Sequence, residues 1–217
     1  MTQPDGREVL SGRRAQAARN DGVILTAARD VFVADPDAPI GAVARAAGVG
    51  ISALYRRYPC KEALLATLCL DGLRRFVAIA KDAGEVTDAW EGFVAFLRGI
   101  VEADVHSLTV YLAGRFTPTP EHRELAKQAG SLADDILRRA QHAGVVRADL
   151  ESTDLPMIYE QLAAIRLGDP DRVRELRRRY LDVHLAGLRA AAASSYGGLS
   201  GAAPTLSEIG ARWNPAT

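Results

Sequence analysis

Hydrophobic residues recur at intervals of three and four along most of the chain, and no segment alternates cleanly between apolar and polar positions. The first spacing is typical of amphipathic helices, whereas strict alternation would indicate a half-buried strand. The first apolar stripe predicts a helix over residues 20–34, and prolines predict a loop over residues 35–39. We therefore expect an all-α protein without a sheet.

Two short helices joined by a tight turn are predicted next, over residues 40–47 and 51–58. Gly48 tolerates the left-handed conformation that ends a helix and turns the chain sharply. A proline disfavours helical geometry at the residue before it, so the second helix ends there. Leu54 and Tyr58 lie four residues apart and point inward together. The outer face that remains is short and basic, which predicts a helix-turn-helix whose second helix enters a DNA major groove.

The rest of the chain is also predicted to be helical. A helix over residues 60–81 is expected to lead into a second domain, and a rigid helix of that length would couple the two domains. Further helices are expected from residue 87 or 88, and over residues 107–115, 120–142, 152–167 and 170–192. In the last of these, the residues predicted to point inward are Val173, Leu176, Tyr180, Val183 and Leu188.

The two ends of the chain are expected to be different in character from its middle. Residues 1–18 are polar and are predicted to be a disordered arm, and residues 194–217 are rich in glycine, proline and serine and are predicted to be largely disordered. Leu206, Ile209 and Trp213 nevertheless indicate a short helix in the tail. Between these ends we expect a helix-turn-helix domain over residues 19–66 and a larger helical domain over residues 67–193.

Three short motifs surround the predicted turn. They are Ala47-Gly48-Val49, Leu54-Tyr55 and Tyr58-Pro59-x-Lys61-Glu62-Ala63-Leu64-Leu65. At this spacing they resemble the signature of the TetR family of transcriptional regulators, over residues 21–68. Gly50, Ala53 and Pro39 differ from the Ser, Thr and Ser or Thr that the family usually has. Glycine is an acceptable helix cap, so these differences leave the expected fold intact and bear on the operator sequence.

The resemblance implies a DNA-binding regulator that reads operator DNA with its second short helix. The residues expected to contact DNA are Arg45, Gly50, Ser52, Ala53, Tyr55, Arg56, Arg57 and Lys61. An arginine of the recognition helix can bind a guanine edge with two hydrogen bonds. Tyr55 and Lys61 match positions that usually hold phosphates and set the register, and Arg45, late in the preceding helix, is expected to do the same. The alternative interpretation is that the arginines are solvated surface charges and that Tyr55 serves packing.

Charge supports the same interpretation without establishing it. The formal net charge of the chain is zero, but residues 13–61 contain eight lysines and arginines against four acidic residues. A modest basic face suits binding to DNA phosphates. Chance asymmetry of an ordinary protein surface would give the same excess.

The resemblance also implies a homodimer, in which the last two long helices form a four-helix bundle with their copies. Ala186, Gly187, Ala190 and Ala191 are small enough to let such helices approach closely. Two-fold symmetry would place the recognition helices about 34 Å apart on a palindromic site. The arginines within residues 172–179 are expected on a solvated face or at the rim of this interface.

Aromatic and polar residues in the middle of the chain are candidates for the lining of an effector cavity. They are Trp90, Phe93, Leu97, Tyr111, Phe116, Met157, Tyr159 and Gln161. Each is alternatively a core-filling residue. Because such cavities are mainly apolar, the predicted function is a repressor that a small apolar or amphipathic effector releases from DNA. The alternative is a helix-turn-helix regulator without an effector, controlled by a protein partner or by its expression level.

Other kinds of chemistry find no support in the sequence. Cys60 and Cys69 have no metal-ligand or disulfide spacing, and the four histidines, among them His106, form no metal-binding motif. The residue orders typical of nucleophilic catalysis and of phosphate-binding loops are also missing, so we expect no enzyme activity and no cofactor. No apolar run reaches the ~18 residues of a membrane span, and the N-terminus lacks a signal-peptide core. A cytoplasmic protein without a membrane partner is expected.

Overall fold

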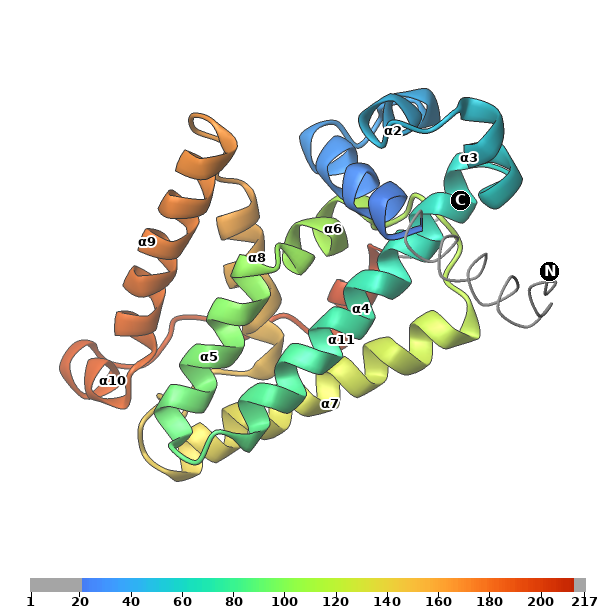
Figure 1. Cartoon of the computed structure of the whole chain (residues 1–217). Helices are drawn as coiled ribbons and strands as arrows, with labels where there is room; N and C mark the ends of the chain where they lie inside the picture. Colours follow the sequence, from blue (N-terminus) through green and yellow to red (C-terminus); the bar gives the residue numbers. More distant parts are fainter. Residues whose placement is uncertain (1–20, 213–217) are drawn as a thin grey trace, which may run out of the picture. The chain divides into compact units, whose positions relative to one another are not determined.

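The computed structural model describes residues 21–212, apart from the side chains of residues 108–111 and 196. Within this range the regular elements are helices, and the only strand-like pairing is an isolated bridge between Val146 and Arg189 (Figure 1). The all-α prediction is therefore confirmed. The predicted arm, residues 1–18, and Trp213 lie outside the described residues. The chain divides into two compact units, with the boundary between Leu68 and Cys69.

The first unit packs three helices and the beginning of a fourth around a small apolar core. Its helices are the segment 21–34, α2 (Ile40–Ala46), α3 (Ile51–Arg57) and the first turns of α4 (Lys61–Glu85). The buried side chains that form this core include Ile24, Ala28, Phe32, Val43, Leu54, Tyr58, Leu64, Leu65 and Leu68. The apolar stripes that predicted these helices are thus mainly the faces that they bury against one another, although Val23, in the stripe that predicted the first helix, is 51% exposed.

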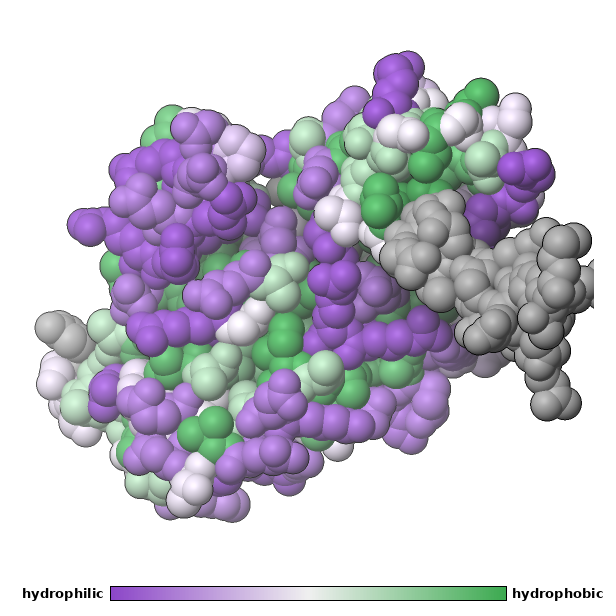
Figure 2. All heavy atoms as spheres, viewed as in Figure 1, coloured by the Kyte–Doolittle hydropathy of each residue, from purple (hydrophilic) through white to green (hydrophobic). Residues whose placement is uncertain are grey.

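The second unit contains the rest of α4 and the remaining helices. These are α5 (Ala89–Glu102), α6 (Val105–Leu112), α7 (Pro120–His142), the short 3-10 turn Ser152–Asp154, α8 (Leu155–Ala163), α9 (Pro170–Leu188), α10 (Ala190–Tyr196) and α11 (Leu206–Ala211). On the face shown in Figure 2, hydrophilic side chains cover much of α9. In the described residues, no helix combines the length and apolar content that crossing a membrane requires.

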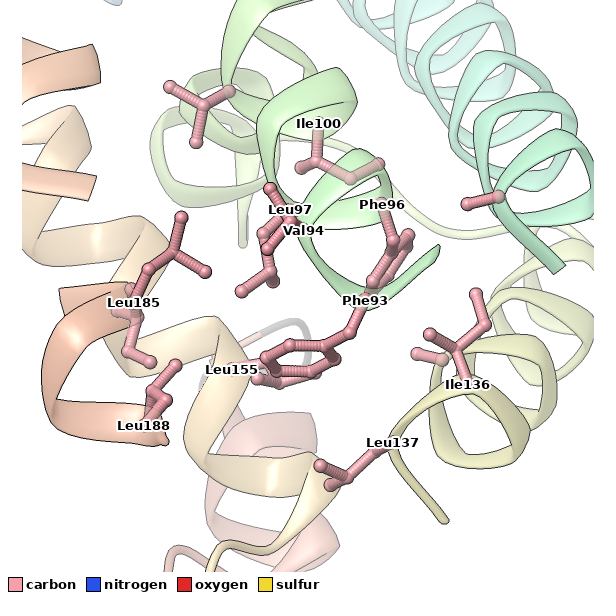
Figure 3. Packing of buried hydrophobic residues seen from close by; sticks show 14 of the residues in the cluster. Phe93, Val94, Phe96, Leu97, Ile100, Ile136, Leu137, Leu155, Leu185 and Leu188 are labelled. Atoms are coloured by element: carbon pink, nitrogen blue, oxygen red, sulfur yellow. The ribbon is translucent and has the colours of Figure 1, made fainter. Parts of the chain in front are cut away.

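Helix α5 is the centre of the second unit. Phe93, Phe96, Leu97 and Ile100 of this helix are inaccessible to solvent. Figure 3 shows these side chains between α7, α8 and α9, which contribute Ile136, Leu137, Leu155, Leu185 and Leu188. Burial of this cluster supplies the main favourable free energy of the unit, because large apolar side chains leave water together.

The apolar face of α9 differs from the predicted one. Leu181 and Leu185 are buried, whereas Tyr180 and Val183 are 49% and 63% exposed. The assignment of Tyr180 and Val183 to the inner face was therefore wrong. Apolar residues occur on more than one side of this helix, and contacts with α8, the preceding helix, and with α5, which is distant in sequence, decide which side is buried.

Helix α9 is also shorter than predicted. Arg147 N–H donates to the Leu188 carbonyl at 3.0 Å, and Ala190 N–H donates to the Val145 carbonyl at 3.2 Å. These bonds hold Arg189 in an extended conformation, with φ −64° and ψ 144°. The helix that the sequence predicted to reach residue 192 is consequently divided into α9 and α10.

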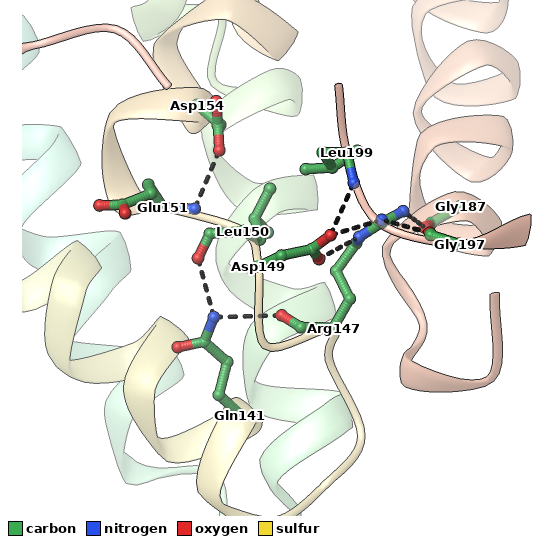
Figure 4. Close-up of polar contacts among 9 residues, drawn as sticks. All are labelled: Gln141, Arg147, Asp149, Leu150, Glu151, Asp154, Gly187, Gly197 and Leu199. Atoms are coloured by element: carbon green, nitrogen blue, oxygen red, sulfur yellow. Dashed lines mark hydrogen bonds and ion pairs between the residues drawn. The ribbon is translucent and has the colours of Figure 1, made fainter. Parts of the chain in front are cut away.

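Arg147 and Asp149 fix this junction from the loop that follows α7 (Figure 4). The Arg147 guanidinium is bonded to the Asp149 carboxylate at 2.6 and 2.9 Å, and to the carbonyls of Gly187 and Gly197 at 3.3 and 3.2 Å. Asp149 also accepts the Leu199 N–H at 2.8 Å. Its hydrogen bonds, above all those from Arg147, hold the pKa of Asp149 well below its usual range. One loop therefore anchors both the end of α9 and the segment after α10.

Gly99 marks a close approach between α4 and α5. A Cβ at this position would lie 2.6 Å from Cγ2 of Ile79. Because overpacking a core typically costs about 1–3 kcal/mol, we expect Gly99→Ala to lower the free energy of unfolding by that amount in urea titrations. Gly84→Ala, in α4, is the control, since its Cβ would meet no atom within 4 Å. Equal stability of the parent and Gly99→Ala would contradict the close contact.

Candidate nucleic-acid interface and ligand cavity

The turn between α2 and α3 is built from backbone hydrogen bonds around one glycine. Gly48 has φ +65°, the left-handed conformation that glycine adopts with little cost. Its N–H donates to the Arg45 carbonyl at 3.2 Å, and the Val49 N–H donates to the Ala44 carbonyl at 3.0 Å. This pair of bonds is a Schellman motif, which satisfies the last carbonyls of α2 and redirects the chain into α3.

Helix α3 is held to its unit by few side chains. Leu54 is its only buried residue, and Tyr58, directly after the helix, is also buried. Gly50 is exposed at its N-cap position, and the five other predicted DNA-contacting residues of α3 are exposed too: Ser52, Ala53, Tyr55, Arg56 and Arg57. The structure therefore brings six of the eight predicted contact residues to one exposed helix.

The four predicted cations are not equivalent. Arg45 and Arg56 are exposed, and neither has an ion pair or a hydrogen bond among the described side chains. Arg57 Nε instead donates to Oδ1 of Asp21 at 2.8 Å, and a second guanidinium nitrogen pairs with Oδ2. Lys61 donates to the Pro36 carbonyl at 3.1 Å, and its ammonium lies 5.1 Å from the centre of a phenylalanine ring. Within the described part of the chain, the guanidinium groups of Arg45 and Arg56 are thus available to an external partner.

The second unit contains a cavity of about 680 Å³. Its walls come from α4, α5, α6, α7, α8 and α11, and its apolar lining includes Phe76, Phe96, Ile100, Leu155 and Ile209. This volume falls within the range of about 300–1,000 Å³ that is common for sites holding small molecules. An apolar cavity of this size is suited to a small apolar or amphipathic ligand.

The eight residues predicted to line a ligand cavity are distributed more widely. Tyr159 does line the cavity. Phe93 and Leu97 lie in the core around α5 instead, and the Arg189 guanidinium lies 3.9 Å from the ring centre of Trp90. The side chain of Tyr111 lies outside the described part.

The other three predicted lining residues also have other neighbours. Phe116 is buried against the ring of His122, with the ring centres 5.1 Å apart. Met157 is half-buried, with its sulfur 4.0 Å from a guanidinium nitrogen of Arg212. Gln161 is exposed. Aromatic content along the sequence therefore located the unit that contains the cavity, but little of its lining.

A buried polar cluster that the sequence did not reveal lies beside the cavity. Arg177, predicted on a solvated or rim face, is only 5% exposed. It donates to the Asp104 carboxylate at 2.7 Å and to the Ala163 carbonyl, at the end of α8, at 3.2 Å. Asp104 also accepts the Ser107 hydroxyl at 2.5 Å. The cluster connects α6, the end of α8 and α9.

His106, one of the lining residues, belongs to the same cluster. Its Nδ1 lies 3.4 Å from the Ile100 carbonyl and 3.7 Å from the Asp104 carboxylate. Burial, with a smaller effect of Arg177, lowers the pKa of His106 to about 4. The imidazole is therefore neutral at pH 7, and its Nε2 and the Tyr159 hydroxyl are buried without a hydrogen-bond partner in the described part of the chain.

The lowered pKa of His106 predicts a loss of stability in acid. An unfolded histidine titrates near pH 6.5 and the folded one near pH 4, so the unfolded state binds more protons between these values. Stability contributed by neutral His106 should be complete above pH 6.5 and fall by up to about 3 kcal/mol towards pH 4. Urea titrations of the parent and His106→Gln test this, because the stability difference between them should change over this interval. A difference independent of pH would contradict the assignment.

Cysteine and metal chemistry have little support in the geometry. Cys60 is exposed, whereas burial raises the pKa of the Cys69 thiol to about 12, far from that of a reactive thiolate. Among the described residues, no three histidine, cysteine, aspartate or glutamate side chains are grouped so that they could hold a metal ion. The exposed helix and the cavity are thus the two candidate sites.

Known proteins resemble both units. Residues 24–68 match the model of bacterial regulatory proteins of the tetR family, and residues 87–190 match the model of the SbtR-like transcriptional regulator C-terminal domain. No curated protein matches the chain.

Solved structures are similar over most of the chain. A TetR transcription regulatory protein from Mycobacterium vanbaalenii is 28% identical, with a TM-score of 0.57 over 81% of this chain and 98% of that one. The TetR transcriptional regulator SCO0520 from Streptomyces coelicolor is also 28% identical, with a TM-score of 0.56 over 78% of this chain and 98% of its own. LfrR from Mycobacterium smegmatis, solved in complex with proflavine, is 20% identical, with a TM-score of 0.57 over 85% and 99%.

Proposed function

The chain belongs to the TetR family of DNA-binding transcriptional regulators, which are not enzymes, and from this we propose that it is a repressor. It binds a palindromic operator as a homodimer, and a small, mainly apolar effector releases it. The observation that carries the DNA-binding part is the exposed face of α3, which presents Ser52, Tyr55 and Arg56 around a single buried anchor, Leu54.

In this proposal some exposed residues of α2 and α3 contact bases and others contact phosphates. Arg56, which is exposed and has no partner among residues 21–212, binds a base edge in the major groove, and Ser52 and Ala53 lie beside it. Tyr55 and Arg45 contact phosphates, and the N-terminus of α3 at Gly50 approaches the sugar-phosphate backbone of the DNA. These contacts fix the register of the helix in the groove.

Arg57 and Lys61 have a second task in the proposal. Each is bonded to another segment of the first unit, Arg57 to Asp21 and Lys61 to Pro36. They therefore position α3 and the loop before α2. The Arg57 side chain remains 59% exposed, so its ion pair leaves it accessible to a phosphate as well.

The homodimer is proposed to form through the last two long helices, α8 and α9. Tyr180 and Val183 expose apolar surface on α9, and the small residues Ala186 and Gly187 follow on the same helix. Burying apolar side chains of this kind against a copy would stabilise the dimer. The two-fold axis would then match the symmetry of a palindromic operator.

The effector part of the proposal depends on the cavity in the second unit. A regulator controlled only by a protein partner or by its expression level would need no internal site for a small molecule, so the 680 Å³ cavity favours the effector-responsive alternative. An effector can weaken DNA binding only to the extent that its affinity is higher for the conformation that does not bind DNA than for the conformation that does. Helix α4 belongs to both units. In this proposal it couples the conformation of the cavity to that of the DNA-binding unit.

Selection of bound fragments from genomic DNA tests this function. The expected result is a short palindromic sequence, bound by a dimer in sedimentation velocity, with protein-coding genes next to it. Thermal-shift screening of apolar compounds then separates the two alternatives, since compounds that raise the melting temperature should also release the operator. Recovery of no enriched sequence would contradict the DNA-binding proposal.

A further inference from the structure

Helix α11 (red in Figure 1) forms part of the cavity wall. Leu206, Ile209 and Arg212 are spaced three residues apart, so they share one side of the segment, and all three line the cavity. We propose that residues 200–212 form a lid that covers part of the cavity and slows the entry of an effector until it opens. This inference rests on the proposed function, because it concerns how the effector site is reached.

The start of the lid is defined by an anchor. The Gly197 carbonyl accepts from the buried Arg147 guanidinium, and the Leu199 N–H donates to Asp149 (Figure 4). The chain is therefore fixed up to residue 199. After it, Gly201 has φ +78°, a conformation that few other residues adopt. The segment between Leu199 and α11 is the hinge of the lid.

Helix α11 is too short to be stable by itself. It contains six residues, whereas isolated helices below about 12–15 residues are marginal in water. A capping box fixes its first turn, in which the Thr205 hydroxyl donates to Glu208 at 2.8 Å and accepts the Glu208 N–H at 3.2 Å. None of its residues is fully buried. The docked conformation therefore depends on contacts with the cavity rim and with α8.

One ion pair latches the far end of the lid. The Arg212 guanidinium pairs with Glu160 of α8 and lies 4.0 Å from the sulfur of Met157. Arg212 is 44% exposed in this pair, and half-exposed ion pairs hold side chains only weakly. The latch thus adds only modestly to the stability of the docked conformation, so that the lid can open.

A lid of this kind controls the rate at which the cavity is filled. The more the closed lid hinders entry, the closer the observed association rate constant falls to the product of the open fraction and the rate constant of the open site. Removing residues 200–217 should therefore increase the association rate constant about 5- to 30-fold, and Arg212→Ala about 2- to 5-fold, because it removes only the latch. The equilibrium affinity should not fall in either variant.

Stopped-flow fluorescence with N-phenyl-1-naphthylamine, a neutral apolar dye, measures these rates. The full chain is compared with the deletion of residues 200–217, with Arg212→Ala and with Glu160→Gln, which breaks the latch from its other side. Arg178→Ala is the matched control, because Arg178 is an exposed arginine on α9 outside the cavity lining. It should leave the rate unchanged. Far-UV circular dichroism verifies that the deletion retains the fold.

Three outcomes would overturn the lid. The first is an association rate that neither the deletion nor Arg212→Ala changes. The second is a deletion that lowers affinity without raising the association rate, because α11 would then hold the ligand and not control its entry. The third is dye binding to neither protein. Binding to the deletion variant alone would support it. Because the dye is measured without DNA, failure here leaves operator recognition untouched, whereas failure of the proposed function would appear in the mobility-shift and sedimentation experiments.

Discussion

Replacing Arg56 by alanine should weaken operator binding more than any other single change on the surface of α3. Arg56 is exposed and has no ion pair or hydrogen bond with residues 21–212, so within this part of the chain its hydrogen-bonding groups are available to a base. A bidentate contact is worth about 1–3 kcal/mol, so two half-sites amount to about 2–6 kcal/mol, or roughly a 30- to 20,000-fold loss of affinity. Mobility-shift titrations with the selected operator, and with variants of each base pair, measure both the loss and the relaxed base preference.

Arg57→Ala is the control for that experiment. It removes the same charge from the neighbouring position, but this arginine is bonded to Asp21 within the protein. We expect Arg57→Ala to lower the affinity for all DNA sequences by about the same factor, so that base preference does not change. This factor should be smaller than the one for Arg56→Ala. If Arg57→Ala altered base preference and Arg56→Ala did not, the assignment of the two arginines would have to be exchanged.

The helix-turn-helix was predictable because its determinants are close together in sequence. Gly48 ends one helix, the proline after Tyr58 ends the next, and Leu54 provides the buried anchor between them. Each of these acts through local backbone geometry or through side chains one helical turn apart. The exposure of α3 follows directly from this pattern, since a seven-residue helix with one fully buried residue leaves the remainder exposed.

The interior of the second unit was not predictable in the same way. Arg177 looked like one of several surface arginines, but Asp104 on the α5–α6 connection and the end of α8 surround it. His106 showed no motif, although burial lowers its pKa to about 4. The burial of both residues depends on which helices, distant in sequence, pack together. A periodic apolar pattern predicts which face of a helix is buried but not which other helices contact that face.

The structure of the C-terminal part of the chain also depends on contacts between residues that are distant in sequence. The apolar spacing continued through residue 192, so a single helix was the natural prediction. The break at Arg189 is caused by backbone bonds to Val145 and Arg147, more than forty residues earlier in the chain. Glycine and serine content suggested disorder after residue 194, yet the anchor at Asp149 and the apolar residues of α11 give this segment defined contacts.

Leu54→Ala should abolish operator binding by unfolding α3 rather than by removing a contact. Leu54 is the only buried residue of α3 and is inaccessible to solvent. Truncating a buried leucine costs about 2–5 kcal/mol, because transfer free energy is lost and a cavity remains. Since α3 has no other buried side chain to hold it, this cost should be concentrated in the first unit. Hydrogen exchange of residues 40–57 should become much faster, while exchange of α5 and α7 stays close to that of the parent.

Leu54→Met separates this packing effect from any specific role of the leucine. Methionine has a similar volume and adapts to the same site, so it should cost less than about 1.5 kcal/mol and retain most operator affinity. Protection of α3 in Leu54→Ala equal to that of the parent would show that other contacts hold the helix. In that case a loss of DNA binding would have to be explained by a shift of α3. Leu54 would then not be the residue that fixes the position of Arg56.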